Sequence, residues 1–231
     1  MASSTLDTMR SFIAAFRALR DQKRADRLAS MKGFLSTFEE THRRIWRTKV
    51  DFNLFNLLGI QTDEVRHSAF LAWLLAPKSG HGQGDLFMRV FIELCSLDLA
   101  HAPLDRYTVR TEFAGEESIV DVMVSAHAQF VIYIENKVLA AEGPDQADRE
   151  LRDLRRLGAA LSVPRRRQYA VFLTPQGRRP TSGDPTRWRM LSYRDLTAAF
   201  TKTLSSINSP RVRMVLEQWI DAVSGFWRST P

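Results

Sequence analysis

Residues 119–137, Ile119-Val-Asp-Val-Met-Val-Ser-Ala-His-Ala-Gln-Phe-Val-Ile-Tyr-Ile-Glu-Asn-Lys137, contain two short runs rich in Val and Ile. β-Branched side chains pack well on a pleated surface, so residues 119–124 and 130–136 are predicted to be β-strands. The short connection around residues 126–128 predicts a hairpin between them. Because the second run is apolar on both faces until its end, it is expected to lie in the interior of a sheet.

Charged side chains interrupt this apolar hairpin at one end. Side chains alternate along a strand, so Glu135 and Lys137 share one face, and a turn centred near residue 128 places Asp121 opposite Glu135. Two carboxylates facing each other across a strand pair are destabilising unless something neutralises them. A divalent cation does so, and Mg²⁺ commonly takes one or two carboxylates while keeping several waters. The pattern therefore predicts a metal site made by Asp121 and Glu135.

Lys137 is expected to act beside this metal, by orienting or deprotonating an attacking water or by offsetting charge on a phosphate. No other set of residues in the chain is comparable: there is no GxxxxGK loop, no zinc-ligand spacing and no GxSxG elbow. The alternative interpretations are an aspartate at a strand end and a solvent-facing Glu135–Lys137 ion pair on an edge strand.

The rest of the chain predicts helices on both sides of these strands. Residues 3–48 have helical periodicity and favour two helices, with the polar residues 20–24 as either a connection or an exposed face. The further elements expected are helices over 62–76 (capped by Thr62), 86–99, 144–161, 193–204 and 211–227, and strands over 107–113, 168–174 and 188–192. This order predicts a mixed α/β or α+β sandwich. We expect a helical extension over residues 1–50 and one domain over 51–231.

The composition is typical of a globular protein and indicates an acidic binding partner. The chain has 231 residues, a hydrophobic fraction of 44% and a net charge of +7, which points to nucleic acid. No apolar run approaches the roughly 18 residues that suggest a membrane span. A single cysteine cannot form an internal disulfide, and no secretory signal is recognisable, so a cytoplasmic location is expected.

Arginines are concentrated between residues 149 and 179, where nine of them stand against two acids, Glu150 and Asp153. A solvated helix face is the simpler explanation for such a run. Its place beside the predicted catalytic strand favours contact with phosphates of DNA, with RNA as the alternative. The arginines expected to bind nucleic acid are Arg149, Arg152, Arg155, Arg156, Arg165, Arg166 and Arg167.

At these residues the sequence resembles the PD-(D/E)xK nuclease superfamily, in which an acid on one strand and an acid-x-Lys on the next build the metal site. Residues 118–121 (SIVD) and 134–137 (IENK) match that pattern. Residues 64–75 (EVRHSAFLAWLL), followed by Pro77 and His81-Gly82, look like the leading helix of a bacterial branch of the superfamily. Gln146 matches a glutamine that exonuclease-like branches follow with a tyrosine four residues later. Glu150 stands there instead, so that pattern is incomplete.

The resemblance implies a restriction-endonuclease-like core, with a mixed sheet of four to five strands flanked by helices and extra N-terminal helices. It implies hydrolysis of phosphodiester bonds in DNA with Mg²⁺, or Mn²⁺ as a substitute, and a role in defence against foreign DNA or in restriction. The implied catalytic residues are Glu64, Asp121, Glu135, Lys137 and Gln146, of which the first three would bind metal.

Two other functions stay open at this point. One is a catalytically silent nucleic-acid-binding module with the same fold. The other is an adaptor subunit of a larger complex, in which the N-terminal helices bind a partner protein or a second copy of the chain.

Overall fold

The computed structural model describes residues 16, 17, 19–37, 40, 52–99, 101–104 and 106–228. The chain divides into two units, Met1–Phe52 and Asn53–Pro231. In the first unit, residues 19–37 form one uninterrupted helix whose side chains are exposed. The polar residues 20–24 lie within this helix and are exposed, so the exposed-face interpretation is confirmed and the connection is wrong. The remainder of the expected helical region, residues 3–15 and 41–48, lies outside the described residues.

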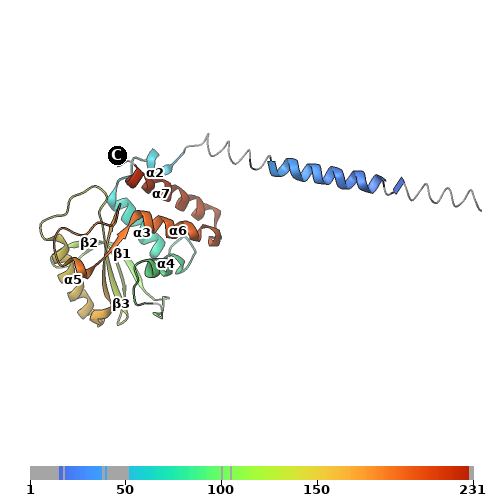
Figure 1. Cartoon of the computed structure of the whole chain (residues 1–231). Helices are drawn as coiled ribbons and strands as arrows, with labels where there is room; N and C mark the ends of the chain where they lie inside the picture. Colours follow the sequence, from blue (N-terminus) through green and yellow to red (C-terminus); the bar gives the residue numbers. More distant parts are fainter. Residues whose placement is uncertain are drawn as a thin grey trace, which may run out of the picture. The chain divides into compact units, whose positions relative to one another are not determined.

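The second unit contains five strands and six helices among the described residues (Figure 1). The strands are β1 (Thr108–Ala114), β2 (Ile119–Ala126), β3 (Phe130–Asn136), β4 (Gln168–Thr174) and β5 (Trp188–Ser192). The helices are α2 (Leu54–Leu57), α3 (Glu64–Leu75), α4 (Leu86–Leu94), α5 (Gln146–Ala160), α6 (Tyr193–Thr203) and α7 (Pro210–Arg228). The unit also has three short 3₁₀ turns among the described residues. η1 (Arg165–Arg167) precedes β4, η2 (Pro185–Arg187) precedes β5, and η3 (Leu204–Ser206) follows α6.

The strands form one mixed sheet in the order β1-β2-β3-β4-β5. β1, β2 and β3 pair antiparallel, whereas β3, β4 and β5 pair parallel. The crossover from β3 to β4 runs through α5, as a parallel connection requires. The predicted mixed architecture, with a five-stranded sheet flanked by helices, is confirmed.

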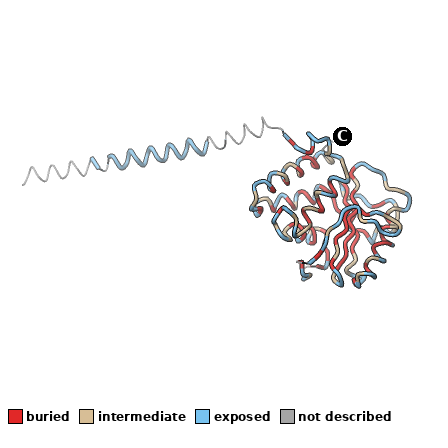
Figure 2. Tube along the Cα trace, turned by 180° about the vertical axis from the view of Figure 1, so that it is seen from behind, coloured by how far each residue is buried: buried red, intermediate tan, exposed pale blue. Residues whose placement is uncertain are grey.

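Helices cover both faces of the sheet, which explains why the central strand β3 is buried throughout (Figures 1 and 2). α5 packs on one face, where Val131 and Tyr133 of β3 join a core with Leu151 and Leu154. α3, α4, α6 and α7 pack on the other face around the even-numbered residues of β3, such as Ile132. Glu135 follows Val131 and Tyr133 on the α5 side because side chains alternate along a strand.

The start of α3 and the end of α4 differ from the sequence prediction for identifiable reasons, whereas the ends of α5, α6 and α7 lie within two residues of it. α3 is capped by Asp63, whose Oδ1 accepts the backbone N–H of Arg66 at 3.0 Å, so Thr62 as the cap was wrong by one residue. The helix expected over 86–99 ends at Leu94, and Ser96 has a φ of 50°. The apolar residues that follow are buried in an irregular segment. In the sequence alone, a short apolar segment of this kind cannot be distinguished from the continuation of a helix.

His67 joins α3 to α7 inside the larger core. Its Nε2 lies 2.8 Å from the carbonyl oxygen of Gln61, and Trp219 Nε1 donates to its Nδ1 at 3.0 Å. Both ring nitrogens therefore have partners that suit a neutral imidazole, and burial lowers the pKa of His67.

None of the described helices is long and apolar enough to cross a membrane.

Asp153 on α5 anchors the turn between β1 and β2. Its carboxylate accepts the backbone N–H groups of Glu116, Glu117 and Ser118 at 3.2, 3.0 and 2.8 Å. The Ser118 hydroxyl and Arg156 Nη1 also donate to it, at 2.7 and 3.0 Å. A buried carboxylate is tolerated only when hydrogen bonds and charges replace the water that it loses. These contacts therefore hold the turn between β1 and β2 on α5.

The turn approaches Asp153 so closely that residue 115 has to be glycine. A Cβ at Gly115 would lie 2.3 Å from Asp153 Oδ2. Burial alone would raise the pKa of Asp153, but the hydrogen bonds from Ser118, Glu117 and Arg156 outweigh it and the pKa is lowered. The folded state therefore binds this proton less readily than the unfolded state. The resulting stability is present above the unfolded pKa and is lost as the pH falls through the folded pKa.

Replacing Asp153 by Asn should lower the free energy of unfolding at pH 7 by about 2–4 kcal/mol, because three backbone donors lose a charged acceptor. The difference from wild type should narrow as the pH falls below about 4, because the Asp153 carboxylate of the unfolded chain then binds a proton more readily than that of the folded chain. Asp145→Asn is the matched control, since Asp145 precedes the same helix and its side chain makes no capping hydrogen bond. Urea denaturation measures both variants, and equal stability of the two at pH 7 would refute this role.

Candidate active site

The carboxylates of Asp121 and Glu135 meet at the end of the β2–β3 hairpin. The strands pair Val122 with Ile134 and Met123 with Tyr133, which confirms the register predicted from the sequence. Extending that register by one pair places Asp121 opposite Glu135. Asp121 Oδ2 accepts the backbone N–H of Asn136 at 2.7 Å, so its side chain bends toward the carboxyl end of β3.

Lys137 lies directly after β3 and forms an ion pair with Glu135. Its Nζ is 2.8 Å from Glu135 Oε1, and the two side chains are 13% and 2% exposed. The backbone N–H of Lys137 donates to Leu173 of β4 at 2.9 Å, which continues the parallel ladder and directs the side chain to the same face as Glu135. The interpretation as a solvent-facing pair on an edge strand is therefore wrong, because β3 lies between β2 and β4.

Gln146, the first residue of α5, connects two acids through one amide group. Its Nε2 donates to Glu135 Oε1 at 2.5 Å and to Glu150 Oε1 at 2.8 Å. Its Oε1 accepts the backbone N–H of Gly143 at 3.0 Å. Both amide hydrogens and the carbonyl oxygen of Gln146 are thus engaged, so its orientation is set by three partners.

Glu150 is a member of this cluster that was not predicted from the sequence, where it was noted only within the arginine-rich run and in place of the tyrosine expected after Gln146. It is 1% exposed and lies one helical turn after Gln146. Two signals could have identified it: its i,i+4 spacing from Gln146, and its position beside Leu151 on the apolar stripe of the helix. A solvated arginine-rich face would not bury an acid there.

Burial shapes the protonation of all three acids. It raises the pKa of Asp121 to about 7 and that of Glu150 to about 9, and in both the charge of Glu135 adds to the shift. Burial also raises the pKa of Glu135, against the opposing effects of Lys137 and Gln146. Burial alone would lower the pKa of Lys137, but Glu135 outweighs it and the pKa is raised. Lys137 is therefore a cation at neutral pH.

The donor atoms present suit a hard divalent cation. Glu135 Oε2 and Glu150 Oε2 are buried and have no hydrogen-bond partner among the described residues. A proton held by Glu150 or a cation would supply the missing partner. No group of three His, Cys, Asp or Glu side chains in the described part of the chain is arranged to hold a metal ion. Two carboxylates completed by waters are nevertheless a common Mg²⁺ environment, and Asp121 and Glu135 provide them.

Glu64, at the start of α3, binds the loop that follows β3. Its Oε1 accepts the backbone N–H groups of Val138, Leu139 and Ala140 at 2.7, 2.9 and 2.9 Å. The charge of Glu64 also influences the pKa values of Asp121 and Lys137, so it lies close to the centre. In this geometry Glu64 holds the loop, and its role as a metal ligand stays a prediction.

A second acid, Glu142, ties the same loop to the segment after β4. Its Oε1 lies 2.5 Å from Arg178 Nη1, and its Oε2 accepts the backbone N–H of Thr181 at 2.9 Å. Arg178 also lies over the ring of Phe172, 5.1 Å from its centroid. The loops at the carboxyl ends of β3 and β4 are thus joined beside Glu135 and Lys137.

The arginines expected to bind nucleic acid differ in their surroundings. Arg152 and Arg156 on α5 both pair with Glu117, each at 2.6 Å. Arg149 is half-buried and donates to the carbonyl oxygen of Pro144. Arg155 is exposed and forms no ion pair with any described residue.

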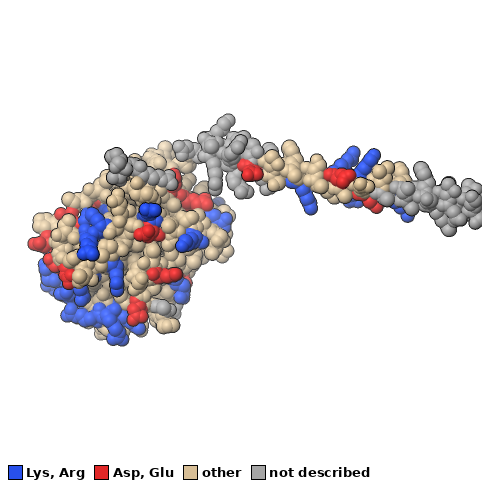
Figure 3. Space-filling model, viewed as in Figure 1, with Lys and Arg blue, Asp and Glu red and all other residues tan. Residues whose placement is uncertain are grey.

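The remaining three arginines form η1, at the start of β4. Arg165 and Arg166 are exposed, whereas Arg167 is half-buried and its Nη1 donates to Gln129 Oε1 at 3.4 Å. In Figure 3 basic side chains lie over much of the visible face of this unit, with the largest group at the lower left, over the lower end of α5. All seven arginines were expected from the sequence to bind nucleic acid, but Arg149, Arg152, Arg156 and Arg167 already have protein partners, whereas Arg155, Arg165 and Arg166 form no ion pair with any described residue.

The family model of the PD-(D/E)XK nuclease superfamily matches residues 52–221, nearly the whole second unit. Neither a curated protein nor a solved structure matches the chain. The matched span includes both strands of the hairpin, α3 and α5, and with them Glu64, Asp121, Glu135, Lys137 and Gln146. The chain belongs to the PD-(D/E)XK nuclease superfamily.

Proposed function

We propose that this chain is a nuclease that hydrolyses phosphodiester bonds in DNA with Mg²⁺, for which Mn²⁺ can substitute. The observation that carries the proposal is the buried Glu135 at the end of β3, with Asp121 across the hairpin and Lys137 Nζ 2.8 Å away. An arrangement so costly to bury is hard to explain as a stabilising feature. It supports a site whose charge balance is completed by a cation and a phosphate.

Asp121 and Glu135 would hold the metal ion, which when bound supplies positive charge next to the phosphate and lowers the pKa of a water. Lys137 holds its proton at neutral pH, so we assign it to orienting the attacking water and offsetting charge on the phosphate rather than to removing a proton. Gln146 and Glu150 orient Glu135, and Glu64 holds the loop after β3 and would contribute a direct or water-mediated ligand.

DNA is proposed as the substrate on the basis of charge and family membership, with RNA as the alternative. The chain carries a net charge of +7, and Arg155, Arg165 and Arg166 are exposed with no ion pair among the described residues. Arg149, Arg152, Arg156 and Arg167 already have protein partners, so we expect them to contribute less to phosphate binding. A role in defence against foreign DNA or in restriction, in the cytoplasm, belongs to the same proposal.

The N-terminal unit is proposed as the surface for a second copy of the chain or for a partner protein. Leu28, Met31 and Leu35 lie on its helix and are 50%, 60% and 49% exposed. Apolar side chains at helical spacing that stay exposed in a single chain commonly mark an interaction surface.

Replacing Asp121 or Glu135 by Ala should abolish metal-dependent cleavage, because each change removes a proposed ligand. Each change also relieves repulsion between buried acids, so the melting temperature in EDTA should stay equal or rise. Linear and circular DNA incubated with Mg²⁺, with Mn²⁺ or with EDTA measures the activity. Glu217→Ala, at an exposed position on α7, serves as the control. If wild type binds DNA but cleaves nothing in any metal, the chain is a silent binding module instead.

Replacing Lys137 by Met keeps the aliphatic stem and removes the charge, so turnover should fall by at least about 10²-fold while DNA binding survives. Arg at this position should not restore turnover, because a planar guanidinium cannot take the place of a compact ammonium 2.8 Å from Glu135. Single-turnover cleavage at saturating DNA measures both variants. Near-normal rates for Lys137→Met would make this residue a structural ion-pair partner only.

Replacing Glu150 by Leu should lower activity by about 10- to 100-fold, the usual scale for losing a group that orients a ligand. Leu removes the acceptor that fixes the Gln146 amide, whereas Glu150→Gln keeps an oxygen at the same place and should lose less. The Mg²⁺ concentration for half-maximal cleavage should rise in the Leu variant more than in the Gln variant. Equal metal dependence in both variants and wild type would show that Glu150 does not support Glu135.

A further inference from the structure

A basic hollow lies at the starts of β4 and β5, away from the carboxyl ends where Glu135 and Lys137 stand. It has a volume of about 230 Å³, and its lining includes Arg165, Arg166, Arg187 and Arg189. These arginines come from three separate elements, η1, η2 and β5. Three elements therefore converge to place four guanidinium groups around one opening.

The charges of these four arginines are not balanced by acids. All four are exposed, and none forms an ion pair with an Asp or Glu anywhere in the described chain. The carboxylate of Asp184 lies near Arg187, but its Oδ1 accepts the N–H and hydroxyl of Thr186 at 2.9 and 2.6 Å and caps η2. Gathering like charges without a counter-ion is unfavourable, so the hollow is suited to an anion.

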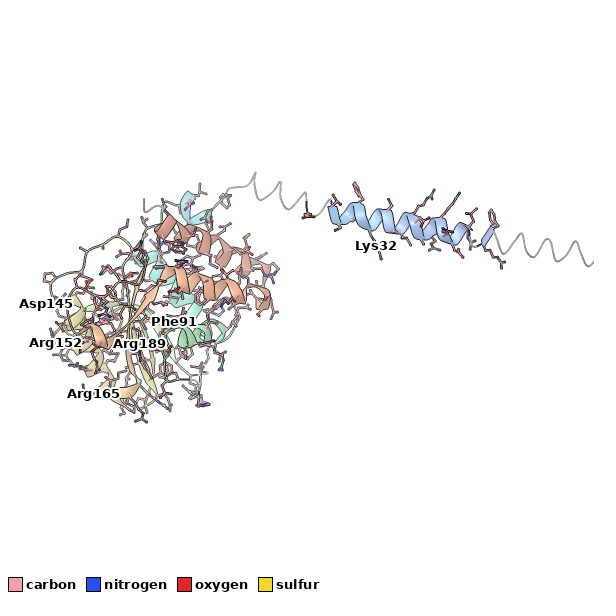
Figure 4. The ribbon with its side chains drawn as sticks, in the orientation of Figure 1. Lys32, Phe91, Asp145, Arg152, Arg165 and Arg189 are labelled. Atoms are coloured by element: carbon pink, nitrogen blue, oxygen red, sulfur yellow. The ribbon has the colours of Figure 1, made fainter. Side chains whose placement is uncertain are left out.

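The basic lining continues along the edge strand β5. A second hollow of about 400 Å³ shares Thr186 and Arg189 with the first and adds Arg179. Arg179 follows Arg178, which belongs to the joined loops beside the proposed catalytic centre. Unpaired arginines thus extend from η1, past β5, to the loop after β4 (Figure 4 labels Arg165 and Arg189).

We propose that this track, formed by Arg165, Arg166, Arg187, Arg189 and Arg179, binds successive phosphates of a nucleic-acid strand outside the catalytic centre. A line of separate guanidinium groups suits a linear polyanion better than one small anion, and guanidinium binds phosphate in a bidentate manner. The partner is the proposed substrate, so this inference rests on the proposed function. It adds Arg179, Arg187 and Arg189 to the contacts expected from the sequence.

The sheet register gives the scale of the track. Gln168, at the start of β4, pairs with Val131, whereas Glu135 pairs with Phe172. Four residues of strand correspond to roughly 13 Å. Neighbouring phosphates of one DNA strand follow at about 3.4 Å along the helix axis, so the start of β4 lies about four phosphate spacings from Glu135 along the strand direction.

The test compares two double variants of the full chain that lose the same charge. Arg187→Gln/Arg189→Gln removes two track residues, and the control Arg89→Gln/Arg213→Gln removes two exposed arginines that already have protein partners, Asp85 and the carbonyl oxygen of Ile207. Binding to labelled duplex and single-stranded DNA is measured by anisotropy with Ca²⁺ in place of Mg²⁺. Kd is measured from about 50 to 200 mM salt. Over this range each phosphate contact multiplies the rise in Kd by about 3.5, so a variant that has lost one contact should show a rise that is about 3.5-fold smaller.

We expect the track variant to lose one or two contacts, which reduces the salt effect on Kd by about 3- to 12-fold, and the control to change by less than about twofold. In cleavage assays the track variant should raise KM and leave kcat at saturating DNA unchanged, because the catalytic centre is untouched. An unchanged salt dependence in the track variant, or an equal change in the control, would overturn the proposal.

The two proposals fail in different ways. If wild type binds DNA with the expected salt effect but never cleaves it, the proposed reaction fails and the track stands. If wild type cleaves DNA but the track variant behaves as wild type, the track fails and the reaction stands. Absence of binding to duplex DNA, single-stranded DNA and RNA alike would overturn the track directly.

Discussion

The carboxylate of Glu135 is only 2% exposed, and removing an ionised acid from water costs several kcal/mol unless nearby groups replace its hydration. Lys137 and Gln146 supply one ion pair and one hydrogen bond, both to the same oxygen, Oε1. The other oxygen has no partner among the described residues. The strand register, the start of α5 and the loop after β3 are all arranged around this one partly compensated charge.

The first turn of α5 contacts Glu135, and the rest of the helix packs on the sheet. Its first turn brings Gln146 and Glu150 to Glu135, and Leu151 and Leu154 cover the sheet. One turn further, Asp153 binds the turn between β1 and β2. Because α5 contacts both the end of β3 and the turn that leads into β2, the position of Asp121 on β2 depends on residues of α5 more than twenty positions later in the chain.

The arginines of the second unit also fall into two groups, those paired with acids and those without an acidic partner among the described residues. Arg152 and Arg156 neutralise Glu117 next to the Asp153 anchor, so they belong to the structure of the hairpin. Arg165, Arg166, Arg187 and Arg189 surround a hollow and have no acidic partner among the described residues. A charge that is already paired gains little from a phosphate, because the phosphate would have to displace its partner. For the proposed binding of nucleic acid, the position of an arginine relative to acids therefore matters more than the number of arginines.

Local patterns in the sequence determined the elements of the sheet and the pair at its centre. Alternation and β-branched runs predicted β2, β3 and β4, and a fixed period of two was enough to place Asp121 opposite Glu135. The acid-x-Lys spacing was readable because both side chains lie on one strand. These features depend on neighbours in sequence or on one hairpin, where the geometry follows from the period.

Only the tertiary structure decided which other polar residues join that pair. Glu150 and Asp153 read as two acids among many arginines, and the fold buries both because they lie on the inner face of a crossover helix. Glu64 reads as a helix-start charge or a metal ligand, yet its Oε1 accepts three backbone N–H groups of a loop more than seventy residues away. Such partners are set by packing between distant segments, which has no period in the sequence.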